Sequence, residues 1–346
     1  MHLLSENDIE QLIDPALAIE AAADAYRLHA CGTLPKPGRL DLPRQEPAGS
    51  VLVLAGHGPN GLFSVKANAH IYPEPTSRLR HAASMMVLWD AARCRPLALL
   101  STRGFNNHRT AAGLAAAAHR LAAPEAATLA VFGAGKIAPT VIRYLQRIRP
   151  LKRILILGRG SARSNMLAPA LANEAAFAHC KVSAETDAEK AVAEADIIIT
   201  ITTATEPVFP GQAVKPGTLV ILAGANRPQA READDALIGR AVIYVDHYDS
   251  CIARAGDLAI PLASGALASA QIAGEIGQLF ADRHSSPGLG EITVFKSTGI
   301  ITQDIVLADI LLRRALARGM GLEFDPESGV RPPAASSVET AHEDAR

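Results

Sequence analysis

The chain has 346 residues, of which 49% are hydrophobic and 20% charged, and this length is enough for two domains. Its formal net charge of -1 gives no general attraction to nucleic acid or to an anionic membrane. No apolar run reaches the roughly 18 residues of a membrane span, and the N-terminus has acidic residues and no signal-peptide pattern. We therefore expect a cytoplasmic protein that binds neither nucleic acid nor membrane.

The cysteines and histidines show no local metal-binding pattern. The four cysteines are far apart and none forms a C-x-x-C pair, so we expect inert thiols. The eleven histidines contain no H-E-x-x-H motif or comparable spacing. A metal site would need ligands assembled from distant parts of the chain, and we predict none.

The chain begins with two helix starts. Ser5, with Asp8 three residues later, forms a capping-box variant, and Asp14 with Pro15 is a second cap with proline at the first helical position. The second helix is predicted to end near Cys31.

Short apolar strands follow a proline-rich stretch. Residues 34–50 include four prolines and two glycines, which exclude long regular structure apart from a short edge strand. A turn at 90–93 separates two of the later apolar runs, so this region is predicted to be an antiparallel, hairpin-rich sheet. The predicted strands are 51–54, 62–68, 83–89 and 96–101.

A helix and a linker lead out of this sheet. From Asn107 the sequence NHRTAAGLAAAAHRLA is strongly helical and is predicted to place Arg109 in the first turn. Pro124 marks the passage into a second domain. That domain is predicted to end near Gly299, after which residues 300–318 form a long amphipathic helix.

The segment from Thr128 to Leu145, TLAVFGAGKIAPTVIRYL, has the pattern of a strand, a glycine turn and a helix. Gly133 permits a tight turn, Gly135 lets the backbone approach a pyrophosphate, and Ala138 occupies the third small position. The amides and the dipole at the start of the helix favour a negative charge. The pattern indicates a dinucleotide-binding turn.

Further apolar runs follow this turn and alternate with helical segments. Such alternation is typical of a doubly wound parallel sheet, the Rossmann arrangement. The predicted strands are 153–157, a short one around 182, 196–201, 219–223, 242–245 and a last one in the stretch 291–299.

The end of the second predicted strand bears on the choice of nicotinamide cofactor. An acidic residue that binds the ribose of NAD normally lies there, about twenty residues past the glycines. Here no Asp or Glu occurs between Thr128 and Asn173, whereas Arg159, Ser161 and Arg163 follow the strand. Arginine suits a 2′-phosphate, so NADP(H) is the favoured cofactor and NAD(H) the alternative.

Five blocks together resemble the ornithine cyclodeaminase/μ-crystallin family. The resemblance covers about residues 5–320, with the blocks in the family's order and spacing, and it is closer to μ-crystallin-like ketimine reductases than to true ornithine cyclodeaminases. The blocks are Lys66 in FSVK, HRTAA at 108–112, VFGAG at 131–135, AGANRPQAREADD at 223–235 and VFKSTG at 294–299.

The resemblance implies a domain that binds substrate and forms a homodimer, a Rossmann domain, and an active site in the cleft between them. It also implies nicotinamide chemistry on a small amino or imino acid, with Arg39, Lys66 and Arg109 holding the substrate carboxylate. A planar guanidinium is well shaped for that task. The expected fold class is therefore α/β, a Rossmann doubly wound parallel sheet plus an α+β substrate-binding and dimerisation domain.

One position departs from the cyclodeaminases. Where they have an aspartate that handles the substrate amine, this chain has Asn226, which cannot act as a general base but can hydrogen-bond to a nitrogen. Residues 50–65 also contain no carboxylate, so none is expected beside Lys66. Hydride transfer to an imine needs less proton transfer than ornithine cyclisation. We assign Lys66 and Asn226 as the catalytic residues; Lys66 would supply the proton, or the imine would arrive already protonated.

These observations favour an NAD(P)H-dependent reductase of small imino acids of the ketimine, pyrroline-2-carboxylate or piperideine-2-carboxylate type, which would be an amino-acid dehydrogenase in reverse. Two alternatives stay open. One is an ornithine cyclodeaminase, an NAD-dependent ammonia-lyase giving proline. The other is a cofactor-binding protein with little turnover.

The predicted domain boundaries are 1–122 for the first domain, 123–299 for the Rossmann domain, 300–320 for a helix returning to the first domain, and 321–346 for a disordered tail. The predicted cofactor-binding residues are Thr110, Gly133, Ala134, Gly135, Lys136, Ile137, Ala138, Arg159, Ser161, Arg163, Thr202, Thr203, Lys296, Ser297 and Gly299.

Overall fold

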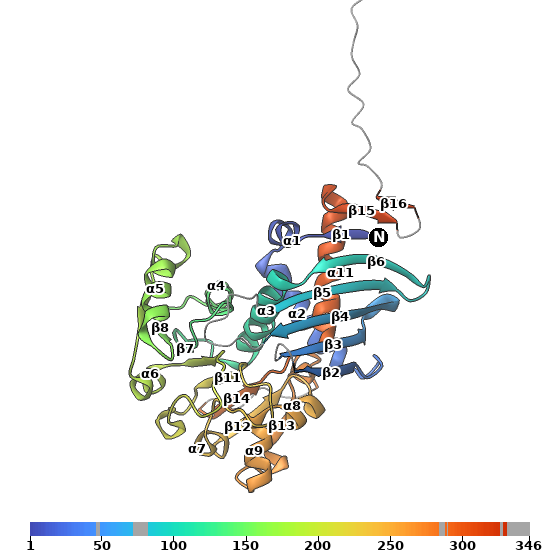
Figure 1. Ribbon diagram of the computed structural model, residues 1–346. Coiled ribbons are helices and arrows are strands. Elements are labelled where there is room, and N and C mark those ends of the chain that lie inside the picture. The colour runs from blue at the N-terminus through green and yellow to red at the C-terminus, as the bar shows by residue number, and fades with distance from the viewer. Residues whose placement is uncertain (46–48, 72–81, 284–287, 289, 326–327, 331–346) are drawn as a thin grey trace, which may run out of the picture.

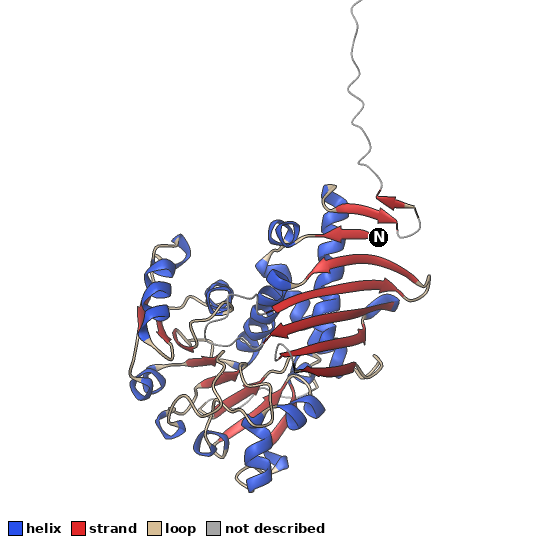
Figure 2. Ribbon diagram, in the orientation of Figure 1, coloured by secondary structure: helices blue, strands red, loops and turns tan. Residues whose placement is uncertain are grey.

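Two eight-stranded sheets organise the protein in the computed structural model (Figures 1 and 2). It describes residues 1–45, 49–71, 82–283, 288, 290–325 and 328–330. Among these residues no helix is both long enough and apolar enough to cross a membrane. The expected combination of a parallel Rossmann sheet with a second, mixed domain is confirmed.

The first sheet is built from both ends of the chain, in the order β16-β15-β1-β6-β5-β4-β3-β2. Its central part, β2 to β6, is an antiparallel meander, as predicted, whereas β1 pairs in parallel with β6. The strands are β1 (His2–Leu4), β2 (Gly38–Arg44), β3 (Gly49–His57), β4 (Leu62–Ile71), β5 (Ala82–Asp90), β6 (Arg95–Ser101), β15 (Leu322–Asp325) and β16 (Gly329–Val330).

One face of this sheet is covered by helices. Figure 1 shows α2 (Pro15–Ala30) and α11 (Ile301–Arg318) behind the strands. The third helix, α3 (Arg103–Leu121), contacts α2, and α11 contacts both α2 and β3. The caps of the first two helices are confirmed: Ser5 forms a capping box before α1 (Glu6–Leu12), and the Asp14 carboxylate accepts amide hydrogen bonds at the start of α2.

The second sheet is wholly parallel, in the order β13-β12-β14-β11-β10-β7-β8-β9. β7 lies between β8 and β10, so the strand order reverses there, and ligands of such sheets bind at this switch point. The strands are β7 (Thr128–Phe132), β8 (Arg153–Leu157), β9 (Lys181–Ala184), β10 (Ile197–Thr200), β11 (Leu219–Leu222), β12 (Ala241–Val245), β13 (Ile272–Glu275) and β14 (Ile292–Lys296).

Shorter helices connect these strands. They are α4 (Ala138–Ile148), α5 (Ser161–Ala172), α6 (Ala188–Glu194), α7 (Asp235–Ile238), α8 (Tyr248–Arg254), α9 (Gly256–Ser264) and α10 (Ile276–Phe280).

Several details differ from the sequence predictions. Neither β1 nor β13 was predicted: β1 has only three residues, and β13 has only two apolar ones, Ile272 and Ala273, before Gly274. The tail prediction is wrong for Leu322–Asp325, since β15 gains its order by pairing with β1; residues 331–346 lie outside the described part of the chain. The helix predicted from Asn107 begins at Arg103, so Arg109 lies in its second turn and not in its first.

Candidate active site

A cleft at the carboxyl ends of β7, β8 and β10 carries the glycine turn. Gly133 has φ 116°, and a Cβ there would lie 2.4 Å from the carbonyl oxygen of Ile201. Both facts require glycine. At Gly135 a Cβ would meet nothing within 4 Å, so that position leaves open space beside the start of α4, where Ala138 is buried.

The cleft has a volume of about 1040 Å³, enough for a large ligand. Arg159 and Arg163 line its wall, and the Arg159 guanidinium donates to the Thr203 hydroxyl at 3.3 Å. Glu206 also lines it, but from the segment after β10 and not from the end of β8. The turn, the space and the helix start fit a dinucleotide.

From this cleft a row of loops continues along the same edge of the sheet. The carboxyl ends of β10, β11 and β14 are neighbours, so the loops that carry Thr202, Asn226 and Ser297 lie in that order. The Asn226 side chain is exposed. These predicted site residues, far apart in sequence, therefore share one edge.

A buried glutamate, Glu232, holds two of these loops together. Its carboxylate accepts hydrogen bonds from the Thr202 amide and hydroxyl, and from the amides of Gly224 and Ala225. The Thr202 hydroxyl is thus committed to the protein. Glu232 fixes the backbone on either side of the row, next to Asn226.

Asp246, after β12, fixes the third loop. Its carboxylate accepts from the Ser297 hydroxyl and from the amides of Thr298 and Gly299, at 2.6 to 2.9 Å. This loop was predicted to border the nicotinamide, and its geometry depends on an acid that the sequence analysis did not single out.

Lys296 has a different environment from the one expected of a cofactor ligand. Its side chain is fully buried, and its ammonium group donates to the Asp257 carboxylate at 2.9 Å and to the Ala225 carbonyl at 2.7 Å. The ammonium group is therefore enclosed by protein, and the Lys296 carbonyl accepts from the Asp246 amide at 3.1 Å.

Lys66 lies on the helix-covered face of the first sheet. Along β4 the side chains of Ser64, Lys66 and Asn68 are buried, while those between them are exposed. The Lys66 ammonium donates to the carboxylate of Asp304 on α11 and to the Asn106 side-chain oxygen on α3. The expectation that no carboxylate lies beside Lys66 is wrong, because α11 returns to the first sheet and brings Asp304 with it.

Two opposing influences act on the Lys66 ammonium. Burial holds the pKa of Lys66 below its ordinary value, and the Arg109 cation acts in the same direction. The Asp304 carboxylate opposes both and favours the charged form. Burial and Arg109 thus favour the neutral amine, and the ion pair with Asp304 favours the ammonium form.

Arg109, on α3, links this cluster to the Rossmann loops. Its Nε lies 3.6 Å from the Asp304 carboxylate, and a Cβ on Gly299 would lie 2.7 Å from its Nη1. Gly299 has φ 81°, a left-handed conformation that favours glycine. The guanidinium therefore stands between the buried acid and the loop that ends the row.

Arg39, on β2, lies on the same face of the first sheet as Lys66 but does not contact Lys66. In the register Arg39 is opposite Leu54, which is opposite Lys66, so all three side chains emerge on one face. Two strand spacings, roughly 10 Å, separate Arg39 from Lys66. Its guanidinium is paired with Asp41 at 3.1 Å.

Only some of the predicted cofactor residues line the cleft, and Thr202 and Thr203 are among them. Gly133, Ala134, Gly135, Arg159 and Arg163 line it. Lys136 and Ile137 form the turn before α4, Ser161 begins α5, and Thr110 is half-buried next to Arg109 on α3.

Sequence reasoning missed Asn106, Glu232, Asp246, Asp257 and Asp304. One signal could have found the last of them. Asp304 occupies the buried side of an amphipathic helix among Ile301 and Ile305, and a buried carboxylate needs a partner.

A family model described as the Ornithine cyclodeaminase/mu-crystallin family matches residues 1–319. The chain is 30% identical to an uncharacterized cyclodeaminase of Sinorhizobium fredii over 94% of this chain and 99% of that protein. It is 33% identical to a Delta(1)-pyrroline-2-carboxylate reductase of Paracoccus denitrificans over 66% of this chain and 72% of that protein.

Among solved structures it is similar to the Delta(1)-pyrroline-2-carboxylate reductase of Thermococcus litoralis in complex with NADH and L-proline. The TM-score is 0.87 and the identity 26%, with 93% of this chain and 100% of that chain covered. The chain belongs to the ornithine cyclodeaminase/mu-crystallin family.

Proposed function

We propose that the protein is an NAD(P)H-dependent reductase of small 2-imino acids such as pyrroline-2-carboxylate. The observation that carries this is the cluster of Lys66, Arg109 and Asp304 at the end of the loop row that begins in the dinucleotide cleft. The similar reductases of Paracoccus denitrificans and Thermococcus litoralis support it.

Each residue has a separate task in this reaction. When bound, the reduced nicotinamide supplies the hydride that adds to the imine carbon. Arg109 anchors the substrate carboxylate next to that carbon, which positions it for attack. Lys66 supplies the proton to the nitrogen, Asp304 keeps the Lys66 ammonium charged, and Asn226 orients the nitrogen by a hydrogen bond.

The absence of a carboxylate at position 226 favours the reductase over the cyclodeaminase. Cyclisation of ornithine with loss of ammonia needs repeated proton transfers, for which an amide side chain is unsuited. Imine reduction needs one hydride and one proton.

The test measures two products in one wild-type sample. NADPH and NADH oxidation is followed with pyrroline-2-carboxylate and piperideine-2-carboxylate, and ammonia release is followed with ornithine. We expect cofactor oxidation with a cyclic imine and no ammonia. Ammonia release without net change in the cofactor would make the protein a lyase, and tight cofactor binding without turnover would make it a binding protein.

We further propose that NADP(H) is preferred. Arg159 and Arg163 line the cleft just after β8, and the chain has no acidic residue from Thr128 to Asn173. The Thermococcus litoralis reductase was solved with NADH, so NAD(H) is the alternative.

Fluorescence titration of both cofactors tests this preference. NADPH should bind at least roughly tenfold more tightly than NADH, about 1.4 kcal/mol. Arg159→Ala should abolish the difference, and Arg147→Ala, an exposed arginine on α4, should not. Equal affinities in the wild type would remove the assigned role of Arg159.

A further inference from the structure

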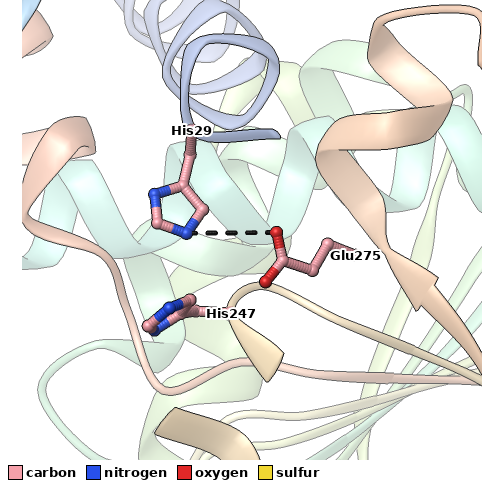
Figure 3. Close-up of side chains that lie close together, drawn as sticks. All are labelled: His29, His247 and Glu275. Atoms are coloured by element: carbon pink, nitrogen blue, oxygen red, sulfur yellow. Dashed lines mark ion pairs between the residues drawn. The ribbon is translucent and has the colours of Figure 1, made fainter. Parts of the chain in front are cut away.

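Three side chains with metal-binding atoms meet where α2 of the first domain touches the Rossmann sheet. They are His29 in the last turn of α2, His247 just after β12, and Glu275 at the end of β13, all partly buried (Figure 3). One ligand atom from each lies within 4.8 Å of the others, and His29 Nε2 is 4.0 Å from the Glu275 carboxylate.

The backbone brings the three together through close contacts. β12 and β13 are paired with Val245 opposite Glu275, so His247 and Glu275 leave the same edge of the sheet. α10 starts directly after Glu275, and a Cβ on Gly277 would lie 2.1 Å from the carbonyl oxygen of Tyr26 on α2. His29, three residues after Tyr26, is thereby held over the strand ends.

The donor set has the chemistry of a transition-metal site. Two imidazoles and one carboxylate are protein ligands of catalytic and other open zinc sites, with metal–ligand distances of about 2.0–2.2 Å. Tetrahedral ligand atoms at such distances are roughly 3.3 Å apart, so the three atoms need to approach one another by at most about 1.5 Å. Soft thiolates are absent from the set, and the mixed nitrogen and oxygen donors suit Zn²⁺, Co²⁺ or Ni²⁺.

Neighbouring contacts orient the Glu275 carboxylate and the two imidazole rings toward one another. Glu275 Oε1 accepts from the Tyr248 amide at 2.8 Å, which orients the carboxylate and leaves Oε2 toward His29. The rings of His29 and His247 are in edge contact, with centroids 4.7 Å apart. Two histidines packed in this way avoid mutual repulsion when both are neutral, which is the form that binds a metal.

We propose that His29, His247 and Glu275 form a binding site for a Zn²⁺-class divalent ion, with a fourth position for water. The ion would join α2 to the ends of β12 and β13. Asp246, the residue before His247, accepts hydrogen bonds from the loop that carries Ser297 and Gly299. The bound ion would therefore stabilise the fold next to the loops at the candidate active site. The sequence predicted no metal site, because these ligands are separated by 28 or more residues.

The test uses the full chain, freed of metal by a chelator. Zn²⁺ is titrated by calorimetry, and Co²⁺ by the visible absorption of its four-coordinate state. We expect one ion per chain and a rise in the melting temperature with Zn²⁺.

His247→Ala and Glu275→Gln should each weaken Zn²⁺ binding by about 100-fold, and should abolish the rise in melting temperature. Gln can still accept from the Tyr248 amide, so this variant keeps the local hydrogen bond. His179→Ala, an exposed histidine, is the matched control and should bind like the wild type.

Circular dichroism and the metal-free melting temperature show whether each variant is folded. The proposal is overturned if the wild type takes up no ion. It is also overturned if Glu275→Gln and His247→Ala, both folded, bind Zn²⁺ as tightly as His179→Ala does, since the ion would then lie elsewhere. Neither readout depends on catalytic activity.

Discussion

At the scale of single residues, two cations share one carboxylate at the candidate active site. Lys66 and Arg109 both face Asp304, and the side chains of Lys66 and Asp304 are almost completely buried. One carboxylate cannot neutralise two cations, so the cluster has an excess positive charge when Lys66 is in its ammonium form. This excess suits the carboxylate of an imino acid.

The first prediction concerns Arg109. Arg109→Ala should lower kcat/KM for the imine by about 100-fold, because the substrate carboxylate loses a charge-assisted partner. This corresponds to a loss of roughly 3 kcal/mol of transition-state stabilisation. NADPH affinity should stay near that of the wild type. Arg103→Ala, an exposed arginine at the start of the same helix, is the control. An equal loss of cofactor affinity in Arg109→Ala would contradict the anchoring role.

The second prediction concerns the pH profile. If Lys66 donates the proton, activity falls as the pH rises through its pKa. Burial and Arg109 lower the pKa of Lys66, and Asp304 raises it, so Asp304→Asn should lower the pKa further and move the alkaline limb of kcat to lower pH. Asp309→Asn, which changes an acid paired with Arg313 on the same helix, should leave that limb in place. An unmoved limb in Asp304→Asn would show that another group donates the proton.

At the scale of elements, two glycines in one turn have different physical requirements. Gly133 has a positive φ and no room for a Cβ, whereas Gly135 has space around it. The first glycine is needed by the fold and the second by the ligand.

The third prediction compares alanine at these two positions. Gly133→Ala should lower the free energy of unfolding by about 2 kcal/mol through strain and the clash with Ile201. Gly135→Ala should keep the stability of the wild type but bind NADPH and NADH more weakly, because its Cβ would enter the space for the pyrophosphate. Chemical denaturation and cofactor titration of both variants measure the two effects. Unchanged cofactor affinity in Gly135→Ala would place the pyrophosphate elsewhere.

At the scale of the whole molecule, the face of the first sheet that points away from Lys66 is apolar and open. Leu40 and Met85 lie in one register row across β2 to β5, and their side chains are 53% and 52% exposed. Leu42 and Val65 are also exposed on this sheet. An apolar face of this kind is typical of an interface with a second copy.

The fourth prediction is therefore a homodimer that buries this face. Sedimentation should show a dimer at micromolar concentration, and Met85→Lys should shift it toward monomer, because a buried unpaired charge is costly. Met166→Lys on α5, where the side chain is 75% exposed, should leave the dimer intact. A wild-type protein that sediments as a monomer would contradict the prediction.

Local patterns were enough to predict much of this molecule. The glycine turn, the apolar strands at 128–132 and 153–157, and the helix caps at Ser5 and Asp14 are confirmed at these positions. Each of these features is determined by residues that are close together in the sequence, as a periodic apolar run or a helix cap is. The order of the motifs was enough to identify the family.

Contacts between distant segments could not be predicted in this way. Asp304 lies 238 residues from Lys66, and β15 pairs with β1 from the opposite end of the chain. Local residue spacing cannot predict such pairs, because they form only when α11 and the terminal strands pack against the first sheet. The sequence by itself therefore determined the Rossmann turn and the candidate cations, and only the tertiary structure decided which buried carboxylate pairs with them, because the free energy of burying a charge depends on what surrounds it.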